Sequence, residues 1–173
     1  MKAKKIAESR TIMTEMIMPN DTNPLGNLMG GNLMRWMDVV GGVCAGKHAE
    51  NHVVTASVDH VSFQNPIRLG DVITLTATVT RAFRTSLEVF VEVFAADITG
   101  HNNRKSNHAY LSFVAIDKDS RKPTPVPAVI PLSSEEEKLY ESAERRRELR
   151  LILSGRIKPA EATQIIEYFN EQK

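Results

Sequence analysis

Cysteine is almost absent from this sequence, which holds one residue of that type, Cys44. A lone cysteine excludes a disulfide framework and favours a reducing compartment. Long hydrophobic runs are also missing, because no apolar stretch approaches the roughly 20 residues that a membrane span needs. The residues after MKAKK turn polar, unlike a secretory leader. We therefore expect a soluble, cytoplasmic protein that does not enter a membrane.

An excess of charge of one sign is missing too. Lys and Arg number 22 against 21 Asp and Glu, which gives a formal net charge of +1 over 173 residues. Proteins that bind nucleic acids or membrane surfaces usually carry a stronger positive field. We expect no nucleic-acid partner, so local cations must meet any anionic ligand. The arginine cluster at 145–150 is favoured as a solvated helix face, with a phosphate or RNA contact as the alternative.

The most informative stretch is residues 23–47, NPLGNLMGGNLMRWMDVVGGVCAGK. A turn rich in Asn, Pro and Gly leads to the pair Gly30–Gly31, after which apolar residues recur at helical spacing. We expect this helix to end at Gly46. No face is polar from residue 39 to residue 45, so the pattern predicts a buried central helix. Asp38 is then a buried acid, kept either for chemistry or for a structural pair.

Apolar and polar residues alternate in the stretches that follow the helix, as expected for strands. The predicted strands are 53–63, 72–81, 87–95 and 106–117, with a short one before the helix at 11–18. A change of phase in the first of the four predicts a bulge near Asp59 and His60. Short connections predict antiparallel neighbours, and one helix covers one face of such a sheet. Phe90, Phe94 and Tyr110 are expected on the open face, so we predict a homo-oligomer that buries them.

The two ends of the chain differ from this core. Residues 1–10 are charged and expected to be frayed. Four prolines between 122 and 131 predict an extended strap that cannot continue the sheet. Ser133 then opens a helix with an acidic first turn, and Pro159 opens a second helix to about Gln172. The sequence therefore predicts an α+β domain at 10–130 and a C-terminal helical extension at 131–173.

The glycine pair has a chemical meaning of its own. The start of a helix carries unpaired backbone N–H groups and the positive end of the dipole, and glycine lets a ligand approach the main chain. Such a site can hold an oxyanion. The alternative is that Gly30 and Gly31 permit tight packing of the helix start.

Residues 23–38, together with VVTASVDHVSFQNPIRLGDVITL and TSLEVFVEV, resemble the acyl-CoA thioesterases of the hot-dog superfamily, of the bacterial and cytosolic acyl-CoA hydrolase type. The resemblance covers roughly residues 10–130. It implies a hot-dog fold, in which an antiparallel sheet wraps around one long central helix. It also implies an acyl-CoA hydrolase that needs no metal or other cofactor. Two subunits would pair into one sheet, often as a trimer of dimers, with the active site at the dimer interface.

The same resemblance assigns catalytic roles. Asp38 would act as a general base on water, or as a nucleophile that forms a mixed anhydride. Asn23 from the opposite subunit would hold the water or the thioester, and the amide of Gly30 or Gly31 would polarise the thioester carbonyl. Many relatives have histidine before the glycine pair, whereas this chain has Met29.

The resemblance further implies a set of contacts to coenzyme A. The strand segment 57–59 would line the pantetheine arm, and the turn at 84–86 would meet the nucleotide end. A polyanion of this kind also needs cations near the mouth of its site. The residues concerned are Ser57, Val58, Asp59, Arg84, Thr85, Ser86, Arg104 and Lys105. Ser62 is expected either to approach the thioester from its strand or to face the exterior of the sheet.

Other chemistries fit the sequence less well. His48 and His52 have metal-compatible spacing but lack a third ligand nearby, so we expect them on the surface and predict no metal site. Cys44 has no obvious base and is favoured as a packing residue. Neither a dinucleotide glycine motif nor a nucleophile elbow is present. The rivals are a non-catalytic acyl-CoA-binding or sensing module and a dehydratase, which normally places a histidine with its acid.

Overall fold

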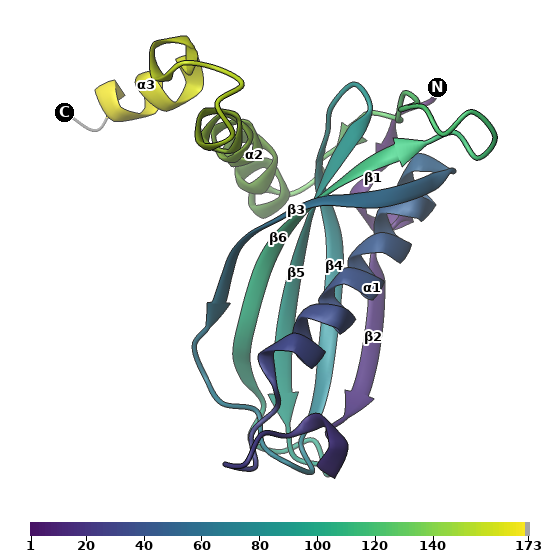
Figure 1. Cartoon of the computed structure of the whole chain (residues 1–173), viewed down its shortest axis with the longest axis vertical. Helices are drawn as coiled ribbons and strands as arrows, with labels where there is room; N and C mark the ends of the chain where they lie inside the picture. Colours follow the sequence, from purple (N-terminus) through teal and green to yellow (C-terminus); the bar gives the residue numbers. More distant parts are fainter. Residues whose placement is uncertain (172–173) are drawn as a thin grey trace. The chain divides into compact units, whose positions relative to one another are not determined.

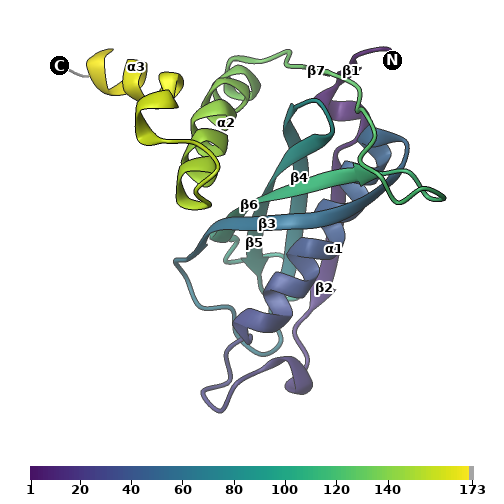
Figure 2. The ribbon, with the colours of Figure 1, turned by 45° about the horizontal axis from the view of Figure 1, so that its top comes forward.

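The computed structural model describes residues 1–171, and of Phe63 it describes the backbone alone. They form two compact units, which divide between Ile130 and Pro131. In the first unit, a long helix lies across one face of a five-stranded antiparallel sheet (Figures 1 and 2). The helix is α1 (Gly30–Ala49), and the strands are β2 (Thr11–Met16), β3 (His52–Phe63), β4 (Val72–Ala82), β5 (Ser86–Ala96) and β6 (Arg104–Ile116). The predicted α+β arrangement of one central helix and an antiparallel sheet is confirmed.

The strands lie in the order β2-β4-β5-β6-β3, so β2 and β3 form the two edges of the sheet. The alternation seen in the sequence separates the two faces of the sheet. In β5, the alternating residues Leu87, Val89, Val91 and Val93 are fully buried. The rings of Phe90 and Tyr110, on the other face, are half-buried and 4.7 Å apart. The open face therefore carries the aromatic residues that we expected there, and its burial by another copy stays a prediction.

Helix α1 presents a narrow buried stripe to the sheet. This stripe contains Leu33, Met37, Val40 and Cys44, each at most 2% exposed. Gly41 also faces the sheet, where a Cβ would come within 3.1 Å of the Phe113 ring. The other side of α1 is open in the single chain, so the prediction of a helix buried all round is wrong for one copy. Hydropathy reports which residues avoid water, and it does not report which chain covers them.

The helix also runs past its predicted end. Gly46 lies inside α1, which continues to Ala49 and stops where Glu50 takes a left-handed conformation with φ of 52°. Both His48 and Ala49 are buried, so packing extends the helix beyond the glycine. Tertiary contacts have overridden a local stop signal.

Residues 1–10 are ordered, so the prediction of a frayed start is wrong. Strand β1 (Lys4–Lys5) pairs in parallel with β7 (Val129–Ile130), which lies in the proline strap. Between β1 and β2, the 3₁₀ turn η1 (Ile6–Glu8) buries Ile6 to 1% exposure. A second 3₁₀ turn, η2 (Pro19–Asp21), follows β2. Burial of an aliphatic side chain explains the order, because its removal from water offsets the cost of fixing the segment.

His48 connects this leader to the strap, and its predicted surface position is wrong. Its ring is fully buried and lies 3.2 Å from the Ser9 hydroxyl through Nδ1 and 3.0 Å from the Pro127 carbonyl through Nε2. A carbonyl oxygen only accepts, so Nε2 carries the proton and Nδ1 accepts from Ser9. Burial lowers the pKa of His48.

Strand β3 is irregular at two places. Its register against β6 shifts between Asp59 and Ser62, and His60 there has φ of 47°. This confirms the bulge predicted near Asp59 and His60. A second shift, between Thr55 and Ser57, was not predicted. Both shifts turn side chains of an edge strand away from regular alternation.

The second unit is helical. Helix α2 (Ser134–Leu153) begins with Ser133, whose hydroxyl accepts from the Glu136 amide at 3.2 Å, as the sequence predicts. Pro159 opens the 3₁₀ turn η3 (Pro159–Glu161), and α3 (Thr163–Glu171) follows; the predicted end at Gln172 lies outside the described residues. In the arginine cluster, the Arg145 guanidinium lies 4.5 Å from the centre of the Tyr168 ring.

Within residues 1–171, no helix combines the length and the hydrophobicity required to cross a membrane.

Candidate active site

Asp38 and Thr55 face one another between the central helix and an edge strand. The Thr55 hydroxyl on β3 donates to Oδ1 of Asp38 on α1 at 2.6 Å. A hydroxyl bond to an ionised carboxylate at this distance belongs to the strong, charge-assisted class. Both residues are exposed in the single chain, so the expected burial of Asp38 is not achieved by one copy.

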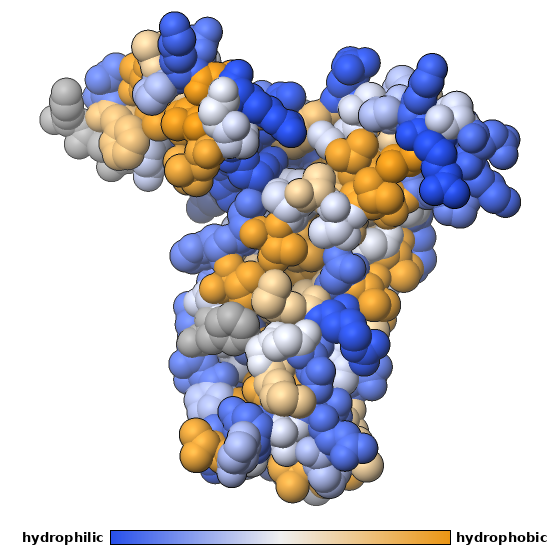
Figure 3. Space-filling view, viewed as in Figure 1, coloured by the Kyte–Doolittle hydropathy of each residue, from blue (hydrophilic) through white to orange (hydrophobic). Residues whose placement is uncertain are grey.

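The pair lies in an open cleft of about 450 Å³. Apart from Asp38 and Thr55, its lining is largely apolar or glycine: Val39, Gly42, Val43, Gly46, Val53 and Phe113, with Asn51 and His52 at one end. Hydrophobic residues gather on this side of the molecule, over α1 and the neighbouring part of β3 (Figure 3). The cleft therefore places one carboxylate and one hydroxyl on a surface suited to an apolar ligand.

Sequence reasoning missed Thr55. It lies in a strand rich in polar alternation, and nothing local separates it from Thr74 or Thr76, which sit at similar positions of β4. The feature that distinguishes Thr55 is its pairing with Phe113 of β6, because Phe113 lies on the sheet face that α1 covers. That pairing is known only once the register of β3 against β6 is known.

Asn23 lies in the loop before α1 and uses one half of its amide locally. Its Oδ1 accepts from the amides of Leu25 at 3.0 Å and Asn27 at 3.2 Å, an Asx turn. Its Nδ2 group has no acceptor among the described residues. Asn23 therefore offers a hydrogen-bond donor. In the described part of one chain, no hydrogen bond joins Asn23 to Asp38.

Gly30 and Gly31 form the first turn of α1, as predicted. Helix geometry leaves their amides without partners inside the helix. A Cβ at Gly31 would meet nothing within 4 Å. Tight packing within one chain therefore does not explain Gly31.

The predicted contacts to the arm, at 57–59, and the predicted thioester contact Ser62 all lie on β3. Ser57, Asp59 and Ser62 are half-buried and Val58 is exposed, and the Ser57 hydroxyl lies 3.5 Å from Oδ2 of Asp59. One edge of β3 pairs with β6, and its other edge has no strand partner in the described chain. The backbone groups of that edge are open to an added strand or to the amides of an extended ligand.

The turn at 84–86 joins β4 to β5 and is held by its main chain. The carbonyl of Arg84 accepts from the Val126 amide at 3.2 Å, and that of Thr85 accepts from the Ala115 amide at 3.0 Å. The Arg84 side chain is exposed and has no carboxylate partner in residues 1–171. Its charge is therefore available to an anion.

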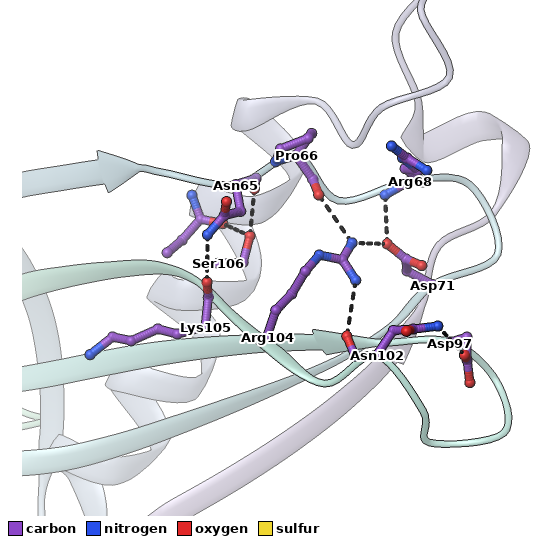
Figure 4. Close-up of polar contacts among 10 residues, drawn as sticks. Asn65, Pro66, Arg68, Asp71, Asp97, Asn102, Arg104, Lys105 and Ser106 are labelled. Carbon is purple, nitrogen blue, oxygen red and sulfur yellow. Dashed lines mark hydrogen bonds and ion pairs between the residues drawn. The ribbon is translucent and has the colours of Figure 1, made fainter.

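Arg104 and Lys105 are differently placed, because acids already balance their charges. Arg104 makes a 2.6 Å ion pair with Asp71 and donates to the Pro66 carbonyl at 3.1 Å (Figure 4). Lys105 makes a 2.7 Å ion pair with Glu92. These partners make the two cations weaker candidates than Arg84 for a phosphate contact.

Cys44 and the histidines offer little chemistry here. The thiol of Cys44 is fully buried, lies 3.4 Å from the Ala77 carbonyl, and has a pKa raised to about 11 by burial. It is therefore a packing residue, as predicted. His52 is exposed. Within the described chain, no three side chains of His, Cys, Asp or Glu gather as metal ligands would.

Comparison with known proteins adds the family. Residues 25–100 match the family model described as Thioesterase superfamily. A protein of Bacillus subtilis, named as the uncharacterized acyl-CoA thioester hydrolase YkhA, is 37% identical over 139 residues, which are 80% of each chain. This chain belongs to the thioesterase superfamily. The predicted hot-dog fold is confirmed by this family match together with the central helix on a five-stranded antiparallel sheet.

Two solved structures show how close the thioesterase likeness is. The acyl-CoA hydrolase of Staphylococcus aureus, solved with butyryl coenzyme A and coenzyme A, is 36% identical with a TM-score of 0.83 over 97% of this chain and 99% of its own. A hexameric acyl-CoA thioesterase is 38% identical with a TM-score of 0.85, over 89% of this chain and 98% of its own. The staphylococcal enzyme has also been solved with alanine in place of an aspartate, a threonine or an asparagine, the last with coenzyme A.

Proposed function

We propose that this thioesterase-family protein hydrolyses acyl-CoA to a carboxylate and free CoA, with Asp38 at the reacting centre. The observation that carries the proposal is the Asp38–Thr55 pair in its open, apolar cleft. In the staphylococcal hydrolase, the asparagine, aspartate and threonine that were replaced by alanine are separated by 15 and 17 residues. Asn23, Asp38 and Thr55 have the same separations here.

The reaction adds water to the acyl carbon and breaks the C–S bond, and the sulfur leaves with a proton. Asp38 either removes a proton from the attacking water or attacks the acyl carbon itself, which forms an anhydride that water then opens. Thr55 is a positioning residue in both routes. Its hydroxyl holds Oδ1, which leaves Oδ2 to face the substrate.

The developing negative charge on the thioester oxygen needs donors. The amide of Gly30 or Gly31 supplies one, and removal of such a donor typically costs about 2.7–4 kcal/mol in barrier height. Asn23 supplies the second through Nδ2, because its Oδ1 is already engaged in the loop. Met29 stands where many relatives have histidine, so no imidazole before the glycine pair takes part.

We propose that the site is completed by a second copy. Four aliphatic side chains of α1 and β3 remain 39 to 46% exposed on the side that holds Asp38: Met34, Val39, Val43 and Val58. The free edge of β3 adjoins them. A partner that paired along this edge would bury the stripe and bring its own Asn23 near Asp38. The hexameric relative supports a trimer of such dimers.

The proposed reaction consumes water and acyl-CoA and uses no metal or redox cofactor. A cytoplasmic location is part of the proposal and rests on the lone free thiol, which favours a reducing compartment. Regions 10–130 and 131–173 are proposed as the thioesterase domain and a helical extension.

The test is release of free thiol from a series of acyl-CoA thioesters of two to eighteen carbons. Wild type should turn over at least one of them, and Asp38→Asn should lose most of the activity while still binding CoA, because a neutral amide is neither base nor nucleophile. Equal rates for the two proteins would reject the role of Asp38. Binding of acyl-CoA without any turnover by wild type would favour the non-catalytic binding module instead.

A further inference from the structure

The first turn of α1 has no side-chain cap, because Met29 stands before it and makes no such hydrogen bond. A usual cap is Ser, Thr, Asp or Asn, whose side-chain oxygen accepts from the amide of the second or third helical residue. The Met29 carbonyl accepts from the amides of Asn32 at 3.1 Å and Leu33 at 3.2 Å. The amides of Gly30 and Gly31 have no acceptor among residues 1–171. Another residue must therefore fix the turn that carries these two open amides.

Asp21, the last residue of η2, holds this turn from outside the helix. Its main-chain carbonyl accepts from the Met29 amide at 2.9 Å. Oδ1 of its carboxylate accepts from Nδ2 of Asn32 at 3.3 Å, and Oδ2 accepts from the Met18 amide at 3.0 Å. Asp21 thus connects the helix start to the turn before it and leaves both glycine amides open.

The bond to Asn32 separates Asp21 from the equivalent acids of the other two 3₁₀ turns. Each turn ends in an acid that accepts from the amide three residues earlier: Glu8 from Lys5 at 2.7 Å, Asp21 from Met18 at 3.0 Å, and Glu161 from Lys158 at 2.6 Å. Glu8 and Glu161 make no further side-chain hydrogen bond or ion pair among residues 1–171. Asp21 also reaches Asn32, which is 11 residues ahead. Capping of its own turn therefore does not account for the second bond.

Asp21 also closes the loop that carries Asn23. Thr22 and Leu28 pair as an isolated β-bridge at the base of this loop. The next pair outward is Asp21 and Met29, which share the 2.9 Å hydrogen bond. Asn23 is two residues from Asp21 along the chain, and the glycine pair follows Met29 directly. The donors proposed for the thioester oxygen, the Asn23 side-chain amide and a glycine amide, therefore extend from the same contact.

We propose that Asp21 is a positioning residue for thioester hydrolysis, an inference that rests on the proposed function. It fixes the first turn of α1 so that the amide of Gly30 or Gly31 faces the developing charge on the thioester oxygen, and it fixes the base of the Asn23 loop. Donors stabilise a transition state most strongly when they are held in place before the reaction. A usual cap before the helix would also fix the turn, but its oxygen would compete for the Gly31 amide. Support from outside the helix avoids this competition.

The experiment measures thiol release from the acyl-CoA that wild type hydrolyses fastest, and calorimetric binding of CoA, well below the unfolding temperature of every variant. Asp21→Ala removes both carboxylate bonds and keeps the main-chain bond to Met29. Its kcat should fall about 10- to 100-fold, because misplaced donors stabilise the transition state less. Its KM and its Kd for CoA should stay within about twofold of the wild-type values, because the same donors contribute little to ground-state binding.

A reciprocal exchange tests whether the contact with Asn32 itself matters. Asn32→Asp places two carboxylates against each other at the helix start, and it should lower kcat as Asp21→Ala does. Asp21→Asn added to Asn32→Asp restores a donor and an acceptor with their places exchanged, and the amide oxygen at position 21 still accepts from Met18. The double variant should recover kcat to within about threefold of wild type, as expected for two residues in direct contact.

The matched control is Glu8→Ala, which removes the acid of the η1 turn and its hydrogen bond to the Lys5 amide. This variant should lower the unfolding temperature and leave kcat at the wild-type value. A purely structural role of Asp21 would give the same pattern in Asp21→Ala, whereas a positioning role adds the loss of kcat.

A wild-type kcat in Asp21→Ala, even with a lower unfolding temperature, would overturn the inference and leave the hydrolase proposal standing. Loss of kcat without recovery in the double variant would also overturn it, because the contact with Asn32 would not be the cause. An equal loss in Glu8→Ala would do the same, since any weakened turn would then suffice. If wild type hydrolyses no acyl-CoA, the proposed function fails, and the inference falls with it.

Discussion

The hydroxyl of Thr55 holds one oxygen of Asp38 at 2.6 Å and connects the edge of the sheet to the middle of the central helix. The contact joins two elements that approach each other only in the folded chain. It orients the carboxylate, which otherwise turns freely on the exposed side of α1. The position of Asp38 toward a substrate therefore depends on a residue 17 positions away in sequence.

Replacement of Thr55 by Val should lower kcat for thioester hydrolysis by about 10- to 100-fold, because a loosely held carboxylate loses its productive geometry. Thr55→Ser keeps the hydroxyl and should retain most of the activity. The measurement is steady-state thiol release for the three proteins, with KM expected to change less than kcat. Similar kcat values for Val and Ser variants would show that the hydroxyl plays no part.

The two atoms of the Asn23 side-chain amide have different roles, which can be tested separately: Oδ1 holds the loop, and Nδ2 is the proposed donor to the substrate. Asn23→Asp keeps the oxygen that accepts from Leu25 and Asn27 and removes the Nδ2 donor. This variant should fold as wild type does and lose about 100-fold in kcat, within the range for one lost donor to a developing oxyanion. Asn23→Ala should lose a similar amount of activity and also stability of about 1 kcal/mol. Thermal unfolding and kinetics of both variants provide the measurements, and an active Asp variant would refute the donor role.

Because His48 is buried, we expect the free energy of unfolding to decrease in mild acid. Burial lowers its pKa in the folded state, so the unfolded chain binds the proton more tightly. Its contribution is therefore fully present above the unfolded pKa of about 6.5 and declines as pH falls below that value, by at most about 1.4 kcal/mol per pH unit. Urea unfolding between pH 7.5 and 5 should show the decline. His48→Gln should be less stable at pH 7.5 but flatter with pH, whereas His52→Gln, at an exposed position, should keep the wild-type slope.

Two adjacent glycines of α1 should respond differently to alanine. At Gly41 the new Cβ would meet the buried ring of Phe113 at 3.1 Å, whereas at Gly42 the nearest ring atom is 3.7 Å away, an ordinary contact. Overpacking costs about 1–3 kcal/mol, and helix propensity returns up to about 1 kcal/mol. Gly41→Ala should therefore lower the free energy of unfolding by about 1 kcal/mol, and Gly42→Ala should leave it unchanged or raise it slightly. Chemical denaturation of both variants measures the difference, and the reverse order would contradict the packing described for Phe113.

Much of the fold follows from periodicity. The alternation in 72–81 and 87–95 requires two-faced strands, and short connections require neighbouring strands to be antiparallel, so the sheet was predictable. The ends of elements were not. Gly46 and the polar leader carry local signals for a stop and for disorder, and in both cases burial of distant side chains, His48 and Ile6, prevails.

The site was predictable in part for a similar reason. Asp38 stands out because a charge among apolar helix residues is costly, and the glycine pair marks a helix start open to a ligand. Thr55, by contrast, is one of several threonines at the polar positions of alternating strands. Its role depends on its pairing with Phe113 of β6, which places its hydroxyl on the sheet face that α1 covers. The charges of Arg104 and Arg84 also look alike until the ion pair of Arg104 with Asp71 is known.

The sequence by itself determined which residues avoid water, where helix and strands lie, and that one acid sits among apolar neighbours, because hydropathy and backbone preference are properties of short segments. Only the tertiary structure decided that Thr55 meets Asp38 and that Arg104 is neutralised by Asp71. Such pairings join residues far apart along the chain. Their geometry depends on how the sheet twists around the helix, which no local pattern encodes.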